Sequence, residues 1–94
     1  MPTKFVPFDM VDFLDSEEAI ATYLNEAIAS NDQDFFLAAL GDVARARGMG
    51  KISAASGLSR ESLYKALRAG ANPAYSTVSR VLAALGVHLV AMPD

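Results

Sequence analysis

Three basic side chains lie close together in the second half of this 94-residue sequence: Arg60, Lys65 and Arg68, with a single acid, Glu61, among them. A guanidinium group can pair with the edge of a guanine through two hydrogen bonds, and both guanidinium and ammonium groups neutralise phosphates. The chemistry that these residue types indicate is contact with double-stranded DNA. The alternative is that the bases only solvate the outer face of a helix.

The candidate contacts extend over one predicted helix and its flanks. On the outer face of that helix we expect Arg60 and Lys65 to meet bases, while Arg68 and Lys51 contact the DNA backbone. Tyr64 either reaches a phosphate or a thymine methyl group, or covers the core. The complete set of predicted DNA-binding residues is Lys51, Ser59, Arg60, Glu61, Tyr64, Lys65, Arg68 and Ser76.

Two short helices joined by a glycine turn would position this face, in a helix-turn-helix at about residues 50–69. Gly57 supplies the positive φ that the turn needs, and Ser59 is a typical N-cap for the second helix. The small residues Ser53, Ala54 and Ala55 would let the two helices cross closely. We expect the Ser53 hydroxyl to bond a backbone carbonyl one turn back. The crossing would be filled by apolar side chains, namely Leu58, Leu63, Ala66 and Leu67.

Apolar residues at helical spacing predict three further helices, at residues 16–29, 32–47 and 76–85. The first has Asp15 or Ser16 as its N-cap, and the second has Asn31 or Asp32. The whole chain is therefore predicted to be all-α with five helices.

The ends of the chain differ from its helical centre. Residues 1–15 read as an N-terminal arm in which "KFVPF" could form a short strand, and residues 16–86 as one helical domain. Residues 87–94 form a C-terminal strand or tail, because "VHLVAM" is β-branched and apolar. A chain of this length has room for one core and hence one domain.

Charge divides the sequence into two unlike halves. Residues 1–44 contain one base and nine acids, a net charge of −8, whereas residues 45–94 contain seven bases and two acids, a net charge of +5. Such asymmetry predicts two surfaces with different partners. The alternative for the acidic half is that its carboxylates only keep the protein soluble.

The composition argues against several other classes of function. The sequence has no cysteine and one histidine, His88, so no thiolate or multi-histidine metal site is expected, and no cofactor is predicted. No serine lies in a nucleophile-elbow pattern, so we expect no enzyme. Neither a secretory signal nor an apolar run long enough to span a membrane is evident, which favours the cytoplasm.

Residues 8–92 carry a family resemblance. The segments "FFLAALGDVARARGMGKIS" and "SGLSRESLYKALRAGANPAYSTVSRVLAALGV" resemble the antidote proteins of toxin–antitoxin addiction modules, and their spacing is similar to that of the Cro/λ-repressor-like (XRE-type) helix-turn-helix domains. Members of that fold often carry glutamine near the start of the first motif helix, where this sequence has Gly50. Lys51 could supply the phosphate contact instead.

The resemblance implies a cytosolic antitoxin that binds a RelE/ParE-type toxin, represses its own operon and forms a homodimer. Toxins of that type are usually basic, so we expect the acidic N-terminal region to meet the toxin. The predicted toxin-binding residues are Phe5, Phe8, Asp9, Asp12, Phe13, Glu17 and Glu18. Two alternatives stay open: a module that neutralises a partner without binding DNA, and a stand-alone repressor.

Overall fold

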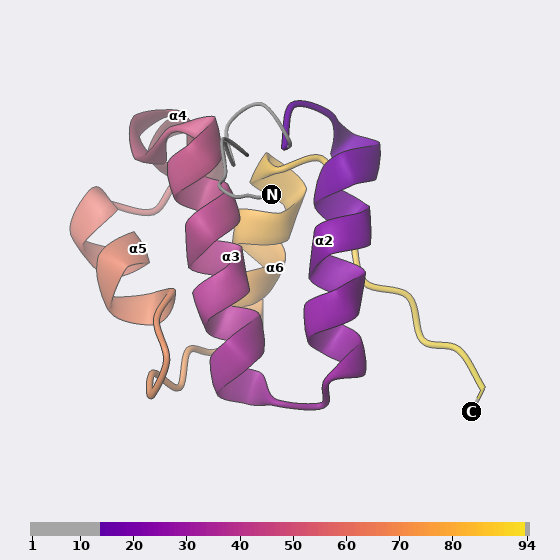
Figure 1. Cartoon of the computed structure of the whole chain (residues 1–94). Coiled ribbons are helices and arrows are strands. Elements are labelled where there is room, and N and C mark those ends of the chain that lie inside the picture. Colours follow the sequence, from indigo (N-terminus) through magenta and orange to yellow (C-terminus); the bar gives the residue numbers. More distant parts are fainter. Residues whose placement is uncertain (1–13, 94) are drawn as a thin grey trace, which may run out of the picture.

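The computed structural model describes residues 14–93, and this part of the chain is all-helical, without a strand. The predicted fold class is therefore confirmed. Within residues 14–93, five helices follow one another (Figure 1): α2 (Glu17–Ala29), α3 (Gln33–Arg47), α4 (Met49–Ser56), α5 (Arg60–Ala66) and α6 (Tyr75–Ala84).

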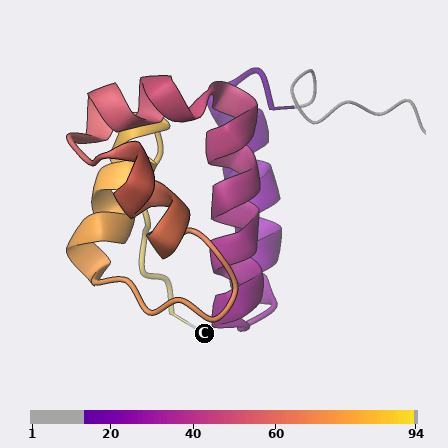
Figure 2. The same cartoon turned by 90° about the vertical axis from the view of Figure 1, so that its left-hand side faces the viewer.

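The apolar stripes of the helices meet in one core. Helices α2 and α3 form a hairpin, α6 lies behind them, and α4 with α5 closes the remaining side (Figures 1 and 2). Each helix contributes residues at helical spacing, since burying one face is what stabilises a short helix. The fully buried large side chains are Leu14, Ile20, Leu37, Leu40, Val43, Leu63 and Val81.

Side-chain caps fix where α2 and α3 begin. The Ser16 hydroxyl accepts a hydrogen bond from the Ala19 amide at 3.1 Å, and the Asp32 carboxylate accepts one from the Phe35 amide at 3.2 Å. Each cap satisfies an amide that the helix itself leaves unpaired. Of the alternatives that the sequence left open, Ser16 and Asp32 are the caps.

Gly41 in α3 allows α5 to end very close to α3. A Cβ atom built at Gly41 would lie 2.5 Å from the backbone carbonyl oxygen of Leu67, the C-cap of α5. Gly41 is buried, so its missing side chain sets the distance between the two helices. The position of α5 therefore depends on Gly41 of α3, a residue without a functional side chain.

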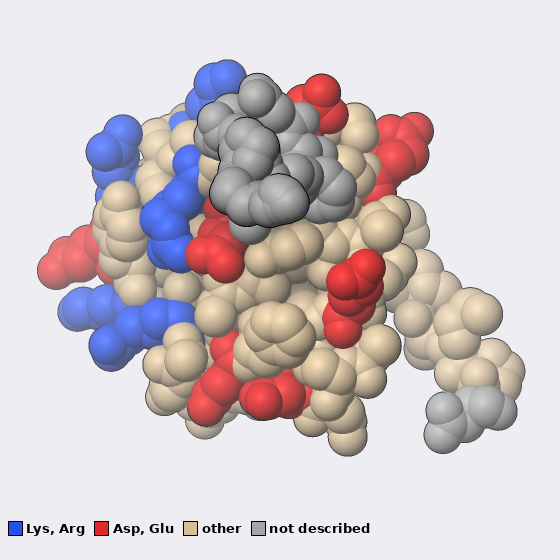
Figure 3. Space-filling view, in the orientation of Figure 1, with Lys and Arg blue, Asp and Glu red and all other residues tan. Residues whose placement is uncertain are grey.

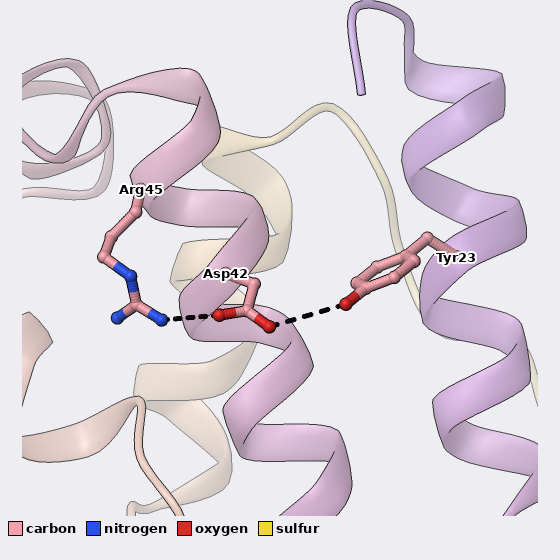
Figure 4. Close-up of polar contacts among 3 residues, drawn as sticks. All are labelled: Tyr23, Asp42 and Arg45. Carbon is pink, nitrogen blue, oxygen red and sulfur yellow. Dashed lines mark hydrogen bonds and ion pairs between the residues drawn. The ribbon is translucent and has the colours of Figure 1, made fainter. Parts of the chain in front are cut away.

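A polar bridge ties α2 to α3 on the surface (Figure 4). The Tyr23 hydroxyl donates to Asp42 at 3.4 Å, and the other oxygen of Asp42 pairs with Arg45 at 2.6 Å. Burial raises the pKa of the Tyr23 phenol, and the charge of Asp42 adds to the rise. The phenol therefore stays protonated and donating at neutral pH. Since the ion pair is exposed, it contributes little to stability.

Of the two alternatives for the C-terminal residues, strand or tail, residues 87–93 form a tail. Residues 87–93 have no regular secondary structure, and the chain leaves the helical body beside α2 as an extended tail (Figure 1). A strand needs a partner for its backbone groups, and no other strand exists in residues 14–93. The predicted N-terminal strand lies outside the described residues.

Candidate nucleic-acid interface

The turn between α4 and α5 has the backbone conformation that the sequence predicts. Gly57 ends α4 with φ +76°, in the left-handed region that favours glycine. Two serine hydroxyls brace the turn: Ser53 donates to the Leu58 carbonyl at 2.6 Å, and Ser56 accepts from the Leu58 amide at 3.2 Å. Both backbone groups of Leu58 are thus satisfied without lengthening either helix.

The bond made by Ser53 corrects the sequence expectation. Its hydroxyl reaches forward across the turn rather than back along α4, because the left-handed glycine folds the Leu58 carbonyl toward it. The expected crossing residues also differ, since Ala54 and Ala55 are exposed. The buried side of α4 is formed instead by Met49, Ile52 and Ser56.

Helix α5 is held by its cap and by two leucines. The Ser59 hydroxyl accepts from the Ser62 amide at 3.0 Å, as the prediction of an N-cap requires. Leu63 is fully buried and Leu67 nearly so, while Leu58 and Ala66 are partly buried. These contacts fix the rotation of α5, which decides which side chains face the solvent.

The exposed side of α5, together with Arg68 just after it, carries five of the predicted DNA-binding residues. We call the exposed side chains of Arg60, Glu61, Tyr64, Lys65 and Arg68 the basic face. Tyr64 is 50 % exposed, so its side chain belongs to this surface more than to the core. Blue side chains gather on the α4–α5 side of the molecule, while the red ones lie mainly elsewhere (Figure 3).

The remaining predicted contacts lie on the neighbouring elements. Lys51 is exposed on α4, Ser59 is exposed at the N-terminus of α5, and Ser76 is exposed in the first turn of α6. Arg68 follows the C-cap of α5, and its Nε donates to the Lys65 carbonyl at 3.3 Å. All eight residues are therefore on the surface.

Sequence reasoning missed a contact between Gly50 and Arg60. A Cβ atom built at Gly50 would lie 2.6 Å from Nη2 of Arg60, so the guanidinium group occupies the space that a side chain at position 50 would fill. The only sign of this contact in the sequence was Gly50 itself, which stands where members of the resembled fold often carry glutamine. Its consequence is that α4 helps to position Arg60.

The left-handed turn gives a direct test of this geometry. Replacing Gly57 by Val should destabilise the protein by about 1–3 kcal/mol, because a β-branched residue is strained at positive φ. A Cβ atom there would also lie 3.3 Å from Nη2 of Arg80. Thermal unfolding measures the effect, and a midpoint equal to that of the wild type would contradict the conformation of Gly57.

Comparison with known proteins identifies the family. Residues 4–93 match the family described as "Probable addiction module antidote protein". The chain belongs to this family. An uncharacterized protein of Haemophilus influenzae is 45 % identical over 87 residues, which cover 93 % of this chain and 90 % of the relative. No solved structure matches the chain significantly.

An antidote implies a toxin as partner, and the structure covers two of the residues predicted to meet it. Glu17 and Glu18 are exposed in the first turn of α2, and the Glu17 side chain lies against Gly86. The other predicted toxin-binding residues lie outside the described part of the chain: Phe5, Phe8, Asp9, Asp12 and Phe13.

The described residues of this antidote contain neither a metal-binding cluster nor a membrane-spanning helix. Within residues 14–93, no three His, Cys, Asp or Glu side chains come together in a way that could hold a metal ion. In the same part of the chain, no helix is both long and apolar enough to cross a membrane. The antidote family suggests a regulatory protein rather than an enzyme.

Proposed function

We propose that this protein is the DNA-binding antitoxin of a toxin–antitoxin module, which neutralises a RelE/ParE-type toxin and represses its own operon in the cytoplasm. The observation that carries the proposal is the basic face. Helix α5 has a side-chain cap and is fixed by two buried leucines, so that Arg60 and Lys65, together with Arg68 just after its C-cap, are exposed to the solvent. Membership of the antidote family supports the antitoxin part.

The basic face suits the major groove of DNA. Helices α4 and α5 would act as a helix-turn-helix of the Cro/λ-repressor type, with α5 as the recognition helix. Arg60 and Lys65 would meet base edges, while Lys51, Arg68 and Ser76 would contact the backbone on either side. Glu61 and Tyr64 lie between them and would contribute to sequence preference.

Two half-sites would require two copies of the chain. One recognition helix covers only a few base pairs, so repressors with such helices commonly bind as symmetric dimers. The proposed interface is α6 with the C-terminal tail, where Met92 is 79 % exposed and Val90 is also exposed. Pairing with a second copy would cover these apolar side chains.

Two measurements in cells test the proposal. Co-expression with the product of the adjoining reading frame should restore growth that this product alone arrests. A reporter fused to the upstream region of the gene should be repressed when the protein is supplied in trans. Rescue without repression would favour a module that neutralises its partner without binding DNA, and repression without a toxic neighbour would favour a stand-alone repressor.

The contact between Gly50 and Arg60 predicts a specific loss of affinity. Replacing Gly50 by Ala should push the guanidinium group from its place, at a cost of about 1 kcal/mol in operator binding, or roughly five-fold. Titration of labelled operator DNA measures the loss. In an Arg60→Ala background, the same substitution should change affinity by less than about two-fold. An equal loss in both backgrounds would show that Gly50 acts independently of Arg60.

A further inference from the structure

A groove on the helical body combines three adjoining hollows. A hollow of about 450 Å³ shares Gln33 and Phe36 with a second of about 230 Å³, and shares Ile28 and Leu89 with a third of about 30 Å³. We call the continuous surface the Phe36 groove. Its apolar side chains come from the end of α2, the start of α3, the start of α6 and the tail: Ile28, Phe36, Val78, Val87 and Leu89.

The groove exposes apolar side chains that the core does not use. Ile28 and Leu89 are each 41 % exposed. Phe36 is partly buried between them. Exposed apolar side chains that line a groove favour contact with another macromolecule.

The groove is lined by one acid and by no lysine or arginine, on elements that are rich in acids. Residues 14–44, which include α2 and most of α3, contain seven acids and no base, and no Lys or Arg lines the three hollows. Asp32 lies in the wall of the largest hollow. This surface would repel nucleic acid, whereas a basic protein segment would be attracted.

We propose that the Phe36 groove is the docking site for a basic segment of the toxin, which seats an apolar side chain between Ile28, Phe36 and Leu89. The inference rests on the proposed antitoxin function and names the surface through which the toxin would be bound. No residue of the basic face lines the groove, so operator and toxin would occupy different surfaces.

This site differs from the one that the sequence predicted. Glu17 and Glu18 lie at the N-terminus of α2, whereas Ile28 lies near its C-terminus. Ile28 is eleven positions further along the helix than Glu17, which corresponds to about 16 Å along the helix axis. The two positions can therefore be tested separately by substitution.

Single substitutions to glutamate provide the test. Calorimetric titration of the full-length protein with the purified product of the adjoining reading frame should show a loss of affinity of at least ten-fold for Ile28→Glu and for Leu89→Glu. The matched control is Phe35→Glu, since Phe35 is 51 % exposed but lines none of the three hollows. The control should bind the toxin within two-fold of the wild type, and Ile28→Glu and Phe35→Glu should keep the operator affinity of the wild type. Leu89 belongs to the tail that is proposed to form the dimer interface, so Leu89→Glu is compared for toxin affinity alone.

A charge variant tests the attraction. Asp32→Asn keeps a side-chain oxygen for the cap of α3, because asparagine caps helices as well as aspartate does. It should slow association with the toxin severalfold at low salt and have little effect at high salt.

The outcomes separate the inference from the function on which it rests. If the wild type binds the toxin and Ile28→Glu and Leu89→Glu bind equally well, the groove is not the docking site although the antitoxin function stands. If Ile28→Glu keeps toxin affinity but becomes monomeric in light scattering, a second copy occupies the groove and the inference is wrong. If the wild type itself binds no such partner, the proposed antitoxin function fails first.

Discussion

Replacing Arg60 and Lys65 together by alanine is expected to abolish specific operator binding while the protein stays folded. Both side chains are exposed on α5, and neither contributes to the core. A guanidinium group bonded to a guanine is worth about 1–3 kcal/mol of discrimination, so loss of Arg60 alone would weaken specific binding by roughly 5–150-fold. Lys65 adds a charge whose loss would also flatten the salt dependence.

A control substitution separates the basic face from net charge. Arg45→Ala removes one positive charge from α3, where Arg45 is already paired with Asp42. Operator affinity of this variant should stay within a few-fold of the wild type. Binding isotherms on the operator and on a scrambled sequence, at several salt concentrations, measure both effects. Unchanged operator affinity in the double alanine variant would show that α5 is not the recognition helix.

Replacing Gly41 by Ala should destabilise the fold by about 2 kcal/mol. Helix propensity alone predicts that Gly41→Ala would stabilise the fold, since alanine is favoured over glycine by about 1 kcal/mol inside a helix. At Gly41, however, the new methyl group would lie 2.5 Å from the Leu67 carbonyl, a backbone atom that cannot rotate away. Overpacking of this kind usually costs about 1–3 kcal/mol.

The matched control is Gly50→Ala, which adds the same methyl group to α4. There the nearest atom is the end of the flexible Arg60 side chain, so stability should be unchanged or slightly raised. Denaturant or thermal unfolding compares the two variants, and a loss of about 2 kcal/mol lowers the melting temperature by roughly 10 °C in a domain of this size. A Gly41→Ala variant as stable as Gly50→Ala would contradict the close approach of α3 and α5.

Features governed by local chemistry could be predicted from the sequence. The caps Ser16, Asp32 and Ser59, the left-handed Gly57 and the inward leucines of α5 follow from rules that act within a few residues. The same rules placed the helix bounds within about two residues.

Features that depend on distant residues could not be predicted. Nothing near Gly41 in the sequence indicates that the carbonyl of Leu67 would lie against it, and the unusual Gly50 did not indicate that Arg60 would be its neighbour. The Phe36 groove joins α2, α3, α6 and the tail, so it exists only in the folded chain. The sequence of the tail also indicated a strand, because strand propensity depends on side-chain types and does not show whether a pairing partner is present.

The central claim is that this antidote binds its own operator through α5. A mobility-shift titration of the upstream region of the gene, with the full-length protein at physiological salt, tests it most directly. We predict a discrete shifted complex at nanomolar protein that unlabelled upstream DNA displaces and a scrambled duplex does not. Equal competition by the two duplexes, or no shift below micromolar protein, would contradict the account.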